Sequence, residues 1–113
     1  MQRDASRARL ASGLVGFSLK QSVNAILKEG RGSADAAFAR QVAMYMVYVT
    51  FGVSLSRVAT AFGRDRSTVA YACHQIEDRR DDPSFDEWLD DLDRALREAA
   101  DLEEPAWTRC LSA

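Results

Sequence analysis

Four hydrogen-bonding side chains in succession, Asp65, Arg66, Ser67 and Thr68, follow closely after Gly63. A carboxylate, a guanidinium and two hydroxyls can hydrogen-bond the edges of DNA bases or the oxygens of phosphate groups. Side chains in the first turn of a helix reach the bases when that helix lies in the major groove. The run therefore predicts the reading end of a DNA-recognition helix.

Two short helices must position this run. The pattern predicts one helix over 54–62, with Ser54 as its N-cap, and a second over 66–78, capped by Asp65. The first helix is too short to be stable alone and must pack on its neighbours. Gly63 permits a tight left-handed turn between the two, as in a helix-turn-helix. The residues that we expect the second helix to bury are Val69, Ala72, Cys73 and Ile76.

The rest of the chain has apolar residues at helical spacing and shows no strand pattern. The predicted segments are a helical stretch over 10–27 that breaks near Gly16 and restarts at Ser18 or Ser22, a helix over 34–50, and a helix over 85–100 with Ser84 as its N-cap. Residues 1–9 are expected to be a frayed basic N-terminus, residues 10–101 the folded domain and residues 102–113 a tail. The fold class is therefore all-α, with five to six helices in a compact bundle.

The charged residues are unevenly distributed along the chain. A net charge of −2 and a pI of about 5.3 argue against nucleic-acid binding. Residues 1–80, however, hold 12 Lys and Arg against 6 Asp and Glu, a balance of +6. Residues 81–113 hold 3 against 11, a balance of −8. A cationic body with an anionic end is compatible with DNA binding, although the modest +6 predicts weak binding with a shallow salt dependence.

Several classes of function are excluded. A chain of 113 residues without GxxxxGK[ST] or GxGxxG lacks a nucleotide-binding domain. The two cysteines, Cys73 and Cys110, suit reduced thiols in the cytosol, and the one histidine, His74, lacks ligand spacing for a metal. The longest apolar run, 42–53, is too short to span a membrane. We expect no enzyme activity, cofactor, metal, membrane contact or small-molecule substrate.

Four short blocks resemble the C-terminal DNA-binding domain, domain IV, of the bacterial replication initiator DnaA. They occur in the order and at nearly the spacing of that family, namely ARQVAMYM at 39–46, SL at 54–55, AFGRDRSTV at 61–69 and ACHQIE at 72–77. With its flanking helices the resemblance covers roughly 14–97. It implies a helix-turn-helix bundle of the TrpR and DnaA domain IV type, standing alone without the family's ATPase domain. It also implies that this bundle reads an asymmetric, A·T-rich DnaA box of about nine bases as a monomer.

The resemblance also implies roles for individual residues. Arg40 matches the arginine that enters the minor groove, and Asp65 matches a base-contacting acid. Ser67 stands at a base-contacting threonine, Thr68 at a phosphate contact, and Tyr71 where the family often has a phosphate-contacting histidine. The predicted DNA-contacting residues are Arg40, Gln41, Ser54, Arg57, Arg64, Asp65, Arg66, Ser67, Thr68 and Tyr71.

Three departures from the family pattern predict a changed target and weaker binding. Arg66 replaces the family's histidine, and arginine prefers the O6 and N7 atoms of guanine. The family's double glycine is the single Gly63, which shortens the turn. The segment 30–38, strongly basic in the family, has little positive charge here.

Other interpretations of the same residues stay open. Asp65 is also explained as a plain N-cap, Arg40 as a solvated helix residue, and the acidic helix as a solvated face or as a means of repelling phosphates. The apolar stretch 42–51 suits either a fully buried helix or a partner-binding face. The leading hypothesis is sequence-specific binding of double-stranded DNA by a nucleoid-associated cytoplasmic protein that controls replication initiation or transcription. The alternative is a protein-interaction module that mimics the initiator's C-terminal domain and binds the initiator or its AAA+ regulator.

Overall fold

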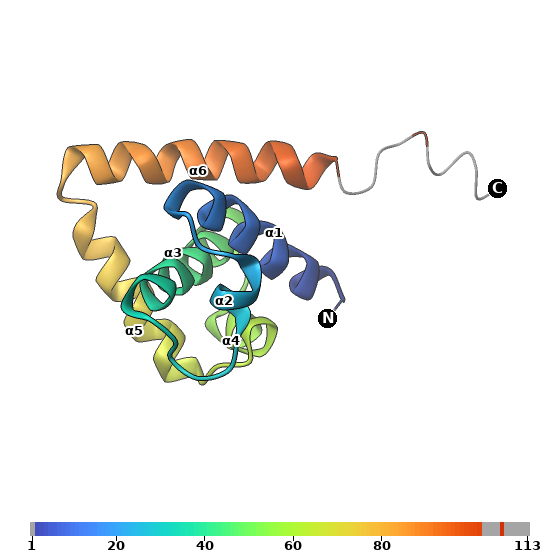
Figure 1. Cartoon of the computed structure of the whole chain (residues 1–113). Coiled ribbons are helices and arrows are strands. Elements are labelled where there is room, and N and C mark those ends of the chain that lie inside the picture. Colours follow the sequence, from blue (N-terminus) through green and yellow to red (C-terminus); the bar gives the residue numbers. More distant parts are fainter. Residues whose placement is uncertain (1, 103–106, 108–113) are drawn as a thin grey trace.

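One helix, α3, runs through the middle of the molecule and packs against the five others (Figure 1). The computed structural model describes residues 2–102 and residue 107. Within them the helices are α1 (Gln2–Leu19), α2 (Val23–Leu27), α3 (Ala34–Phe51), α4 (Leu55–Phe62), α5 (Arg66–Arg79) and α6 (Pro83–Asp101). This confirms the predicted all-α bundle, and the described residues contain no strand.

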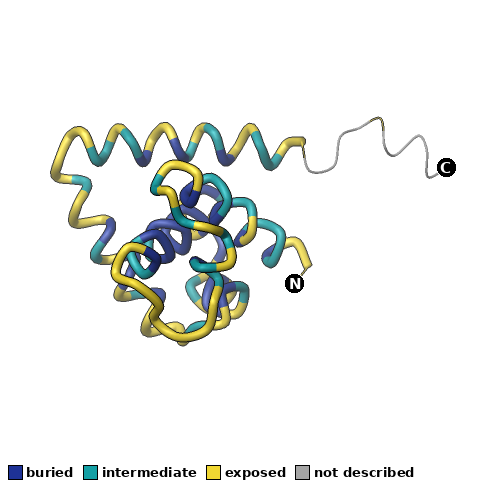
Figure 2. Tube along the Cα trace, in the orientation of Figure 1, coloured by how far each residue is buried: buried dark blue, intermediate teal, exposed yellow. Residues whose placement is uncertain are grey.

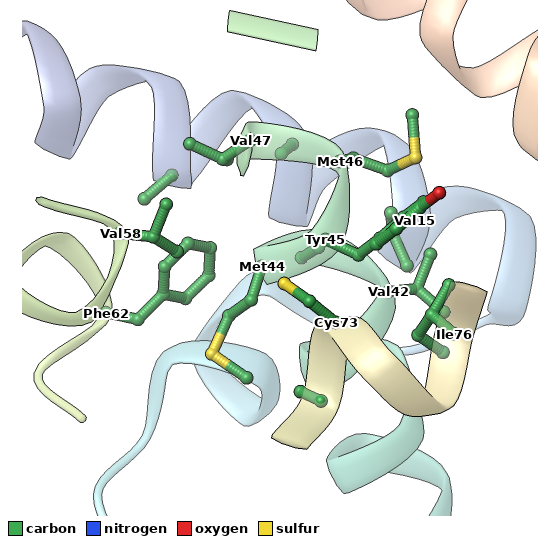
Figure 3. Close-up of a cluster of buried hydrophobic side chains, with 14 of the residues drawn as sticks. Val15, Val42, Met44, Tyr45, Met46, Val47, Val58, Phe62, Cys73 and Ile76 are labelled. Atoms are coloured by element: carbon green, nitrogen blue, oxygen red, sulfur yellow. The ribbon is translucent and has the colours of Figure 1, made fainter. Parts of the chain in front are cut away.

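The position of α3 explains why it is apolar around most of its circumference. Its residues from Val42 to Val47 are all buried (Figure 2). Figure 3 shows their side chains meeting Val15 of α1, Phe62 of α4 and Ile76 of α5. The stretch 42–47 is therefore a core helix and offers no face to a partner, whereas Tyr48 and Val49, one turn further on, are each exposed.

Residues 2–9 are helical, contrary to the frayed segment predicted for residues 1–9. Helix α1 begins at Gln2 and buries Asp4 and Ala8. The Asp4 carboxylate accepts two hydrogen bonds from Arg57 on α4, at 2.8 Å from Nε and 2.7 Å from a terminal nitrogen. A pairing across 53 residues is invisible to a search for local patterns, and so the sequence interpretation missed this start.

The chain reverses after α1 at Lys20, which has a positive φ of 60°, and not at Gly16 as predicted. Gly16 nonetheless makes the reversal possible. Its carbonyl accepts a hydrogen bond of 2.9 Å from the Gln21 backbone N–H, and a Cβ at position 16 would lie 2.2 Å from the Gln21 carbonyl oxygen. Ser22 then caps α2, which confirms one of the two predicted restarts.

Helix α6 crosses the bundle with one face buried through Leu89, Leu92 and Leu96. Its N-cap is Asp82, whose side chain accepts from the Ser84 backbone N–H, so the prediction of Ser84 as the cap was wrong. Pro83 takes the first helical position, where its missing N–H costs nothing. Most of the predicted tail, including Cys110, lies outside the described residues.

Three side-chain contacts fix α6 to the bundle. Trp88 donates its indole N–H to Ser18 of α1 at 2.8 Å, and Thr50 of α3 donates to Asp93 at 2.6 Å. Arg80, at the end of α5, bonds Asp86 at 2.5 Å and Asp90 at 2.6 Å. The start of α6 is thus fixed at the end of α5 by charge-assisted hydrogen bonds, while the helix itself packs on α1 and α3.

Candidate nucleic-acid interface

Helices α4 and α5 form the predicted helix-turn-helix. Ser54 caps α4 by accepting a hydrogen bond of 3.2 Å from the Arg57 backbone N–H. Gly63 ends α4 in the left-handed conformation, with φ 64° and ψ 39°, and its N–H reaches the carbonyls of Ala59 and Thr60. Because a side chain at Gly63 would be strained there, the glycine is what allows the chain to turn into α5 within three residues.

The first turn of α5 presents polar side chains to solvent. Asp65, Arg66, Ser67 and Thr68 are all exposed. The opposite face of the helix packs into the core, and the buried residues are those predicted, Val69, Ala72, Cys73 and Ile76. The helix is therefore anchored along one face while its N-terminal turn remains open, which is how a recognition helix meets a groove.

Asp65 begins α5 without using its carboxylate. Its backbone has the extended conformation of an N-cap, with φ −71° and ψ 147°, but its side chain makes no capping hydrogen bond. Asp65 is therefore the N-cap residue of α5, as predicted, but its carboxylate does not make the capping bond and can accept from a donor outside the protein. Tyr71, four residues after Ser67, is 61% exposed and extends the same face along the helix.

Arg64, in the turn itself, is committed to the loop between α2 and α3. Its two terminal nitrogens donate to the backbone carbonyls of Lys28, at 2.5 Å, and of Gly30, at 2.9 Å. This pairing brings the loop beside the helix-turn-helix. The lowest part of Figure 1 shows the same approach, where the chain between α2 and α3 passes the start of α5.

Arg40 is buried and holds both the end of α2 and the loop that follows it. Its Nε donates to the Ile26 carbonyl at 2.6 Å, and its terminal nitrogens reach the Arg31 carbonyl at 3.2 Å and the Ala25 carbonyl at 3.3 Å. Burial, with the nearby Arg64 charge, lowers the pKa of its guanidinium. Arg40 is thus not a solvated helix residue. For Arg40 to enter a minor groove, it would have to give up these three bonds.

The loop carries two exposed cations that are not among the predicted DNA-contacting residues. Lys28 and Arg31 are exposed, while the carbonyls of both residues are held by Arg64 and Arg40 respectively. The segment 30–38 has little positive charge compared with the family, but it contains Arg31. The signal was nevertheless present, because a glycine-flanked arginine between two helices lies on the surface.

The remaining predicted residues are Arg57, Ser54 and Gln41, and the first two are engaged within the protein. Arg57 donates both of its hydrogen bonds to Asp4, so its charge is neutralised within the protein. Ser54 uses its hydroxyl oxygen as the α4 cap, and Gln41 is half-buried on α3. The structure therefore brings together Arg64, Asp65, Arg66, Ser67 and Thr68 at one end of the helix-turn-helix and leaves these three outside that group.

The negative charges gather at the opposite end of α5. The exposed acids of α6 include Glu87, Asp90 and Asp91, and α6 starts where α5 ends. Since 14 helical residues rise about 21 Å, the acidic helix begins roughly that far from Arg66. The acidic residues of α6 are therefore separated from the polar turn at 65–68 in space as well as along the sequence.

The cysteine and histidine of α5 form no reactive site. Cys73 is buried, and this burial, with the nearby Glu77 charge, raises the pKa of its thiol to about 11. His74 is exposed and lies 3.4 Å from Asp78 on the helix surface. Among the described residues, no three His, Cys, Asp or Glu side chains gather as they would around a metal ion. None of the described helices has the length and apolar character needed to cross a bilayer.

A sequence profile described as "Bacterial dnaA protein helix-turn-helix" matches residues 17–76, more than half of the chain. The chain belongs to this family. Relatives include the chromosomal replication initiator protein DnaA of Lactococcus lactis subsp. cremoris, 44% identical over 62 residues, and DnaA 2 of Chlamydia pneumoniae, 45% identical over 51 residues. These alignments cover 53% and 45% of this chain, but only 14% and 11% of the two relatives.

The fold has a solved counterpart. The crystal structure of a DNA replication initiation factor superposes with a TM-score of 0.77, covering 88% of this chain and 30% of that one, at 23% sequence identity. At that identity the likeness concerns the fold. The chain therefore has the architecture of the DnaA helix-turn-helix domain, a DNA-binding domain associated with replication initiation, and spans about one seventh of the Lactococcus relative.

Proposed function

We propose that this protein binds double-stranded DNA sequence-specifically at sites resembling the DnaA box and controls replication initiation or transcription in the bacterial cytoplasm. The observation that carries the proposal is the open first turn of α5. Its four polar side chains are exposed while the rest of the helix is anchored in the core. The function is one of recognition, with no bond made or broken.

Each side chain of the reading turn suits a particular contact in the major groove. The free Asp65 carboxylate accepts a hydrogen bond from a cytosine or adenine amino group. Arg66 donates to guanine O6 and N7, which moves the preferred sequence away from one read by histidine. Ser67 lies at the base edge, and Thr68 and Tyr71 reach phosphate oxygens.

The loop between α2 and α3 supplies the second part of the interface. Lys28 and Arg31 are exposed beside the turn, so we assign them to phosphate contacts. Arg64 contributes by holding the Lys28 and Gly30 carbonyls. The minor-groove contact of Arg40 requires its guanidinium to exchange three carbonyl partners for groove atoms, and it is the only contact of the proposal that needs such a rearrangement.

The proposal is tested by comparing a DnaA-box duplex with a scrambled duplex across a salt series. The Arg66→Ala variant removes an exposed side chain and should fold normally. It is expected to weaken box binding by about 1–3 kcal/mol and to relax base preference. Arg94→Ala on α6, 65% exposed and far from the reading turn, is the matched control and should bind as the parent does. Equal affinity of the parent for both duplexes would overturn the proposal.

A second candidate function is the protein-interaction module, which would bind the initiator or its AAA+ regulator. It is favoured by the shortage of free positive charge, because Arg40, Arg57 and Arg64 are all engaged within the protein. The same binding experiment separates the two functions. If neither duplex binds and the purified initiator does, the interaction module is supported and DNA reading is not.

A further inference from the structure

An open groove of about 680 Å³ lies where the ends of α1 and α5 meet the beginning of α6. Three aromatic rings line it, Phe38 from α3 and Phe85 and Trp88 from α6. Phe85 lies 6.4 Å from Phe38 and 5.7 Å from Trp88, measured between ring centroids. None of the three rings is fully buried, so the groove presents aromatic surface to the outside.

Arg79 holds this surface in shape. Its guanidinium carbon lies 4.9 Å from the centroid of Phe38 and 5.5 Å from that of Phe85, which is within the range of cation–π attraction. Trp88 is fixed from the other side by its hydrogen bond to Ser18, which also lines the groove. The groove is therefore preformed, and a ligand entering it would not have to order these side chains.

A large apolar side chain stands exposed next to the groove. Phe17, in the last turn of α1, is 89% exposed and directly precedes the groove residues Ser18 and Leu19. A phenylalanine so fully exposed to water forgoes the free energy that its burial would release. A projecting aromatic ring beside an aromatic groove marks an interaction surface.

The same surface carries charges of both signs. Lys20 is exposed immediately after Leu19, and Asp78 and Asp82 line the groove as exposed residues. The Asp78 side chain is 66% exposed and its neighbour is His74. One patch therefore contains a projecting ring and a groove lined by rings. It also contains two cations, Lys20 and Arg79, and two carboxylates, of which that of Asp82 also caps α6.

Because the patch carries both an exposed ring and an aromatic groove, and both positive and negative charges, we propose that it is the interface of a symmetric dimer. Its occupant is a second copy of this chain. A two-fold axis brings one patch against its own copy, so every feature must find its complement on the same surface. Phe17 of each copy enters the groove of the other, and Lys20 of each copy pairs with Asp78 and Asp82 of the other. Binding of an unrelated partner would require only the projecting ring or the groove on this chain, whereas a symmetric dimer requires both.

The dimer leaves the reading turns free. The groove lies at the Arg79 end of α5, and Arg66 lies about 21 Å away along the helix. Two copies joined through their grooves thus present two recognition helices from opposite parts of the assembly. The inference does not depend on DNA binding, since its test measures association of the protein alone.

The experiment is sedimentation equilibrium or light scattering on the full chain, from micromolar to millimolar concentration. We expect the mass to rise from 12.5 kDa towards twice that value. Phe17→Glu changes an exposed side chain, so it should fold normally and raise the dimer Kd at least tenfold. Leu102→Glu, at a 74% exposed position outside the patch, is the matched control and should dimerise as the parent does.

A charge exchange tests the predicted pairing between copies. Lys20→Asp, which suits the left-handed backbone there, and Asp78→Lys should each weaken the dimer, and the double variant should restore it. A parent protein that stays at 12.5 kDa up to millimolar concentration overturns the proposal, even if some other peptide binds the groove. A dimer unaffected by Phe17→Glu overturns it too, because the association would then use another surface.

Discussion

Arg57 and Asp4 form a two-bond ion pair that joins α4 to the first turn of α1, with nitrogen–oxygen distances of 2.8 and 2.7 Å. The pair supplies a charge partner to a buried carboxylate, since the Asp4 side chain is only 8% exposed. It also removes Arg57 from the cations available to DNA. One interaction therefore stabilises the N-terminus and reduces the positive charge of the reading surface.

The stabilising effect of this pair should depend on pH. The hydrogen bonds and charge of Arg57 lower the pKa of Asp4 below its ordinary 3.8, despite the opposing effect of burial. The ionised carboxylate therefore stabilises the fold above the unfolded-state pKa, and this contribution is lost as pH falls through the lower folded-state pKa. Asp4→Asn should lower the midpoint of urea unfolding at pH 7 but have little effect near pH 2. An equal effect at both pH values would contradict the assigned cause.

The two N-caps of the helix-turn-helix should respond differently to substitution. Ser54→Ala removes a capping hydrogen bond and should lower the free energy of unfolding by about 0.5–2 kcal/mol. Asp65→Ala removes no such bond, and so it should cost much less stability but reduce the preference for a box duplex by about 1–3 kcal/mol. Thermal unfolding and duplex titration of both variants check the contrast. Reversed results would assign Asp65 to capping.

Arg40→Ala should destabilise the protein. The substitution leaves the carbonyls of Ala25, Ile26 and Arg31 without their donor, at a cost of about 1–3 kcal/mol for such an unsatisfied group. DNA binding of the folded variant then distinguishes the two roles of Arg40. Equal losses on box and scrambled duplexes indicate that it only holds the loop, whereas a selective loss on the A·T-rich box supports the minor-groove contact.

Lys28 and Arg31 should contribute to affinity without contributing to specificity. Each single substitution to alanine is expected to reduce the slope of log K against log salt by about 0.9, as the loss of one phosphate contact does. The ratio of box to scrambled affinity should stay the same. An unchanged salt slope in both variants would remove the loop from the interface.

Tyr45 should be the source of a late step in an alkaline titration. Burial and the hydrogen bond to Glu77 raise the pKa of its hydroxyl to about 12. Because the folded-state value is the higher one, the stability gained from neutral Tyr45 is lost as pH rises from about 10 to about 12. The tyrosinate absorbance of Tyr45→Phe should lack the component near pH 12, and Tyr71→Phe should retain it. A late component that survives Tyr45→Phe would contradict the assignment.

Local patterns predicted α4, α5 and the turn between them, because Ser54, Gly63 and the apolar spacing of α5 act within a few residues. The buried face of α5 was predicted residue by residue for the same reason. The start of α1 was missed because Asp4 is held by a residue 53 positions away. The burial of Arg40 was not predictable because it depends on two carbonyls of α2 and one of the following loop, whose path no motif describes.

Like the fold, the candidate site was predictable from sequence where it depends on local patterns and not where it depends on contacts between distant residues. The exposed run at 65–68 follows from its polar residue types at the start of a helix and needs no tertiary information. The engagement of Arg64 with the Lys28 and Gly30 carbonyls does need it, since it depends on how α2 and the loop after it fold back. Sequence therefore predicted the exposed polar turn at 65–68, while the structure showed which cations near it are not engaged in carbonyl hydrogen bonds.

The clamp of Arg80 on Asp86 and Asp90 has a consequence for the rate of encounter with DNA. Because it fixes the acidic α6 at the end of α5 far from Arg66, the molecule carries a permanent electric dipole along α5. The field of a DNA duplex would turn such a molecule while it is still diffusing, with its reading turn foremost. Orientation before contact would let even a protein with a net charge of −2 associate quickly, and this advantage would fade as salt screens the field.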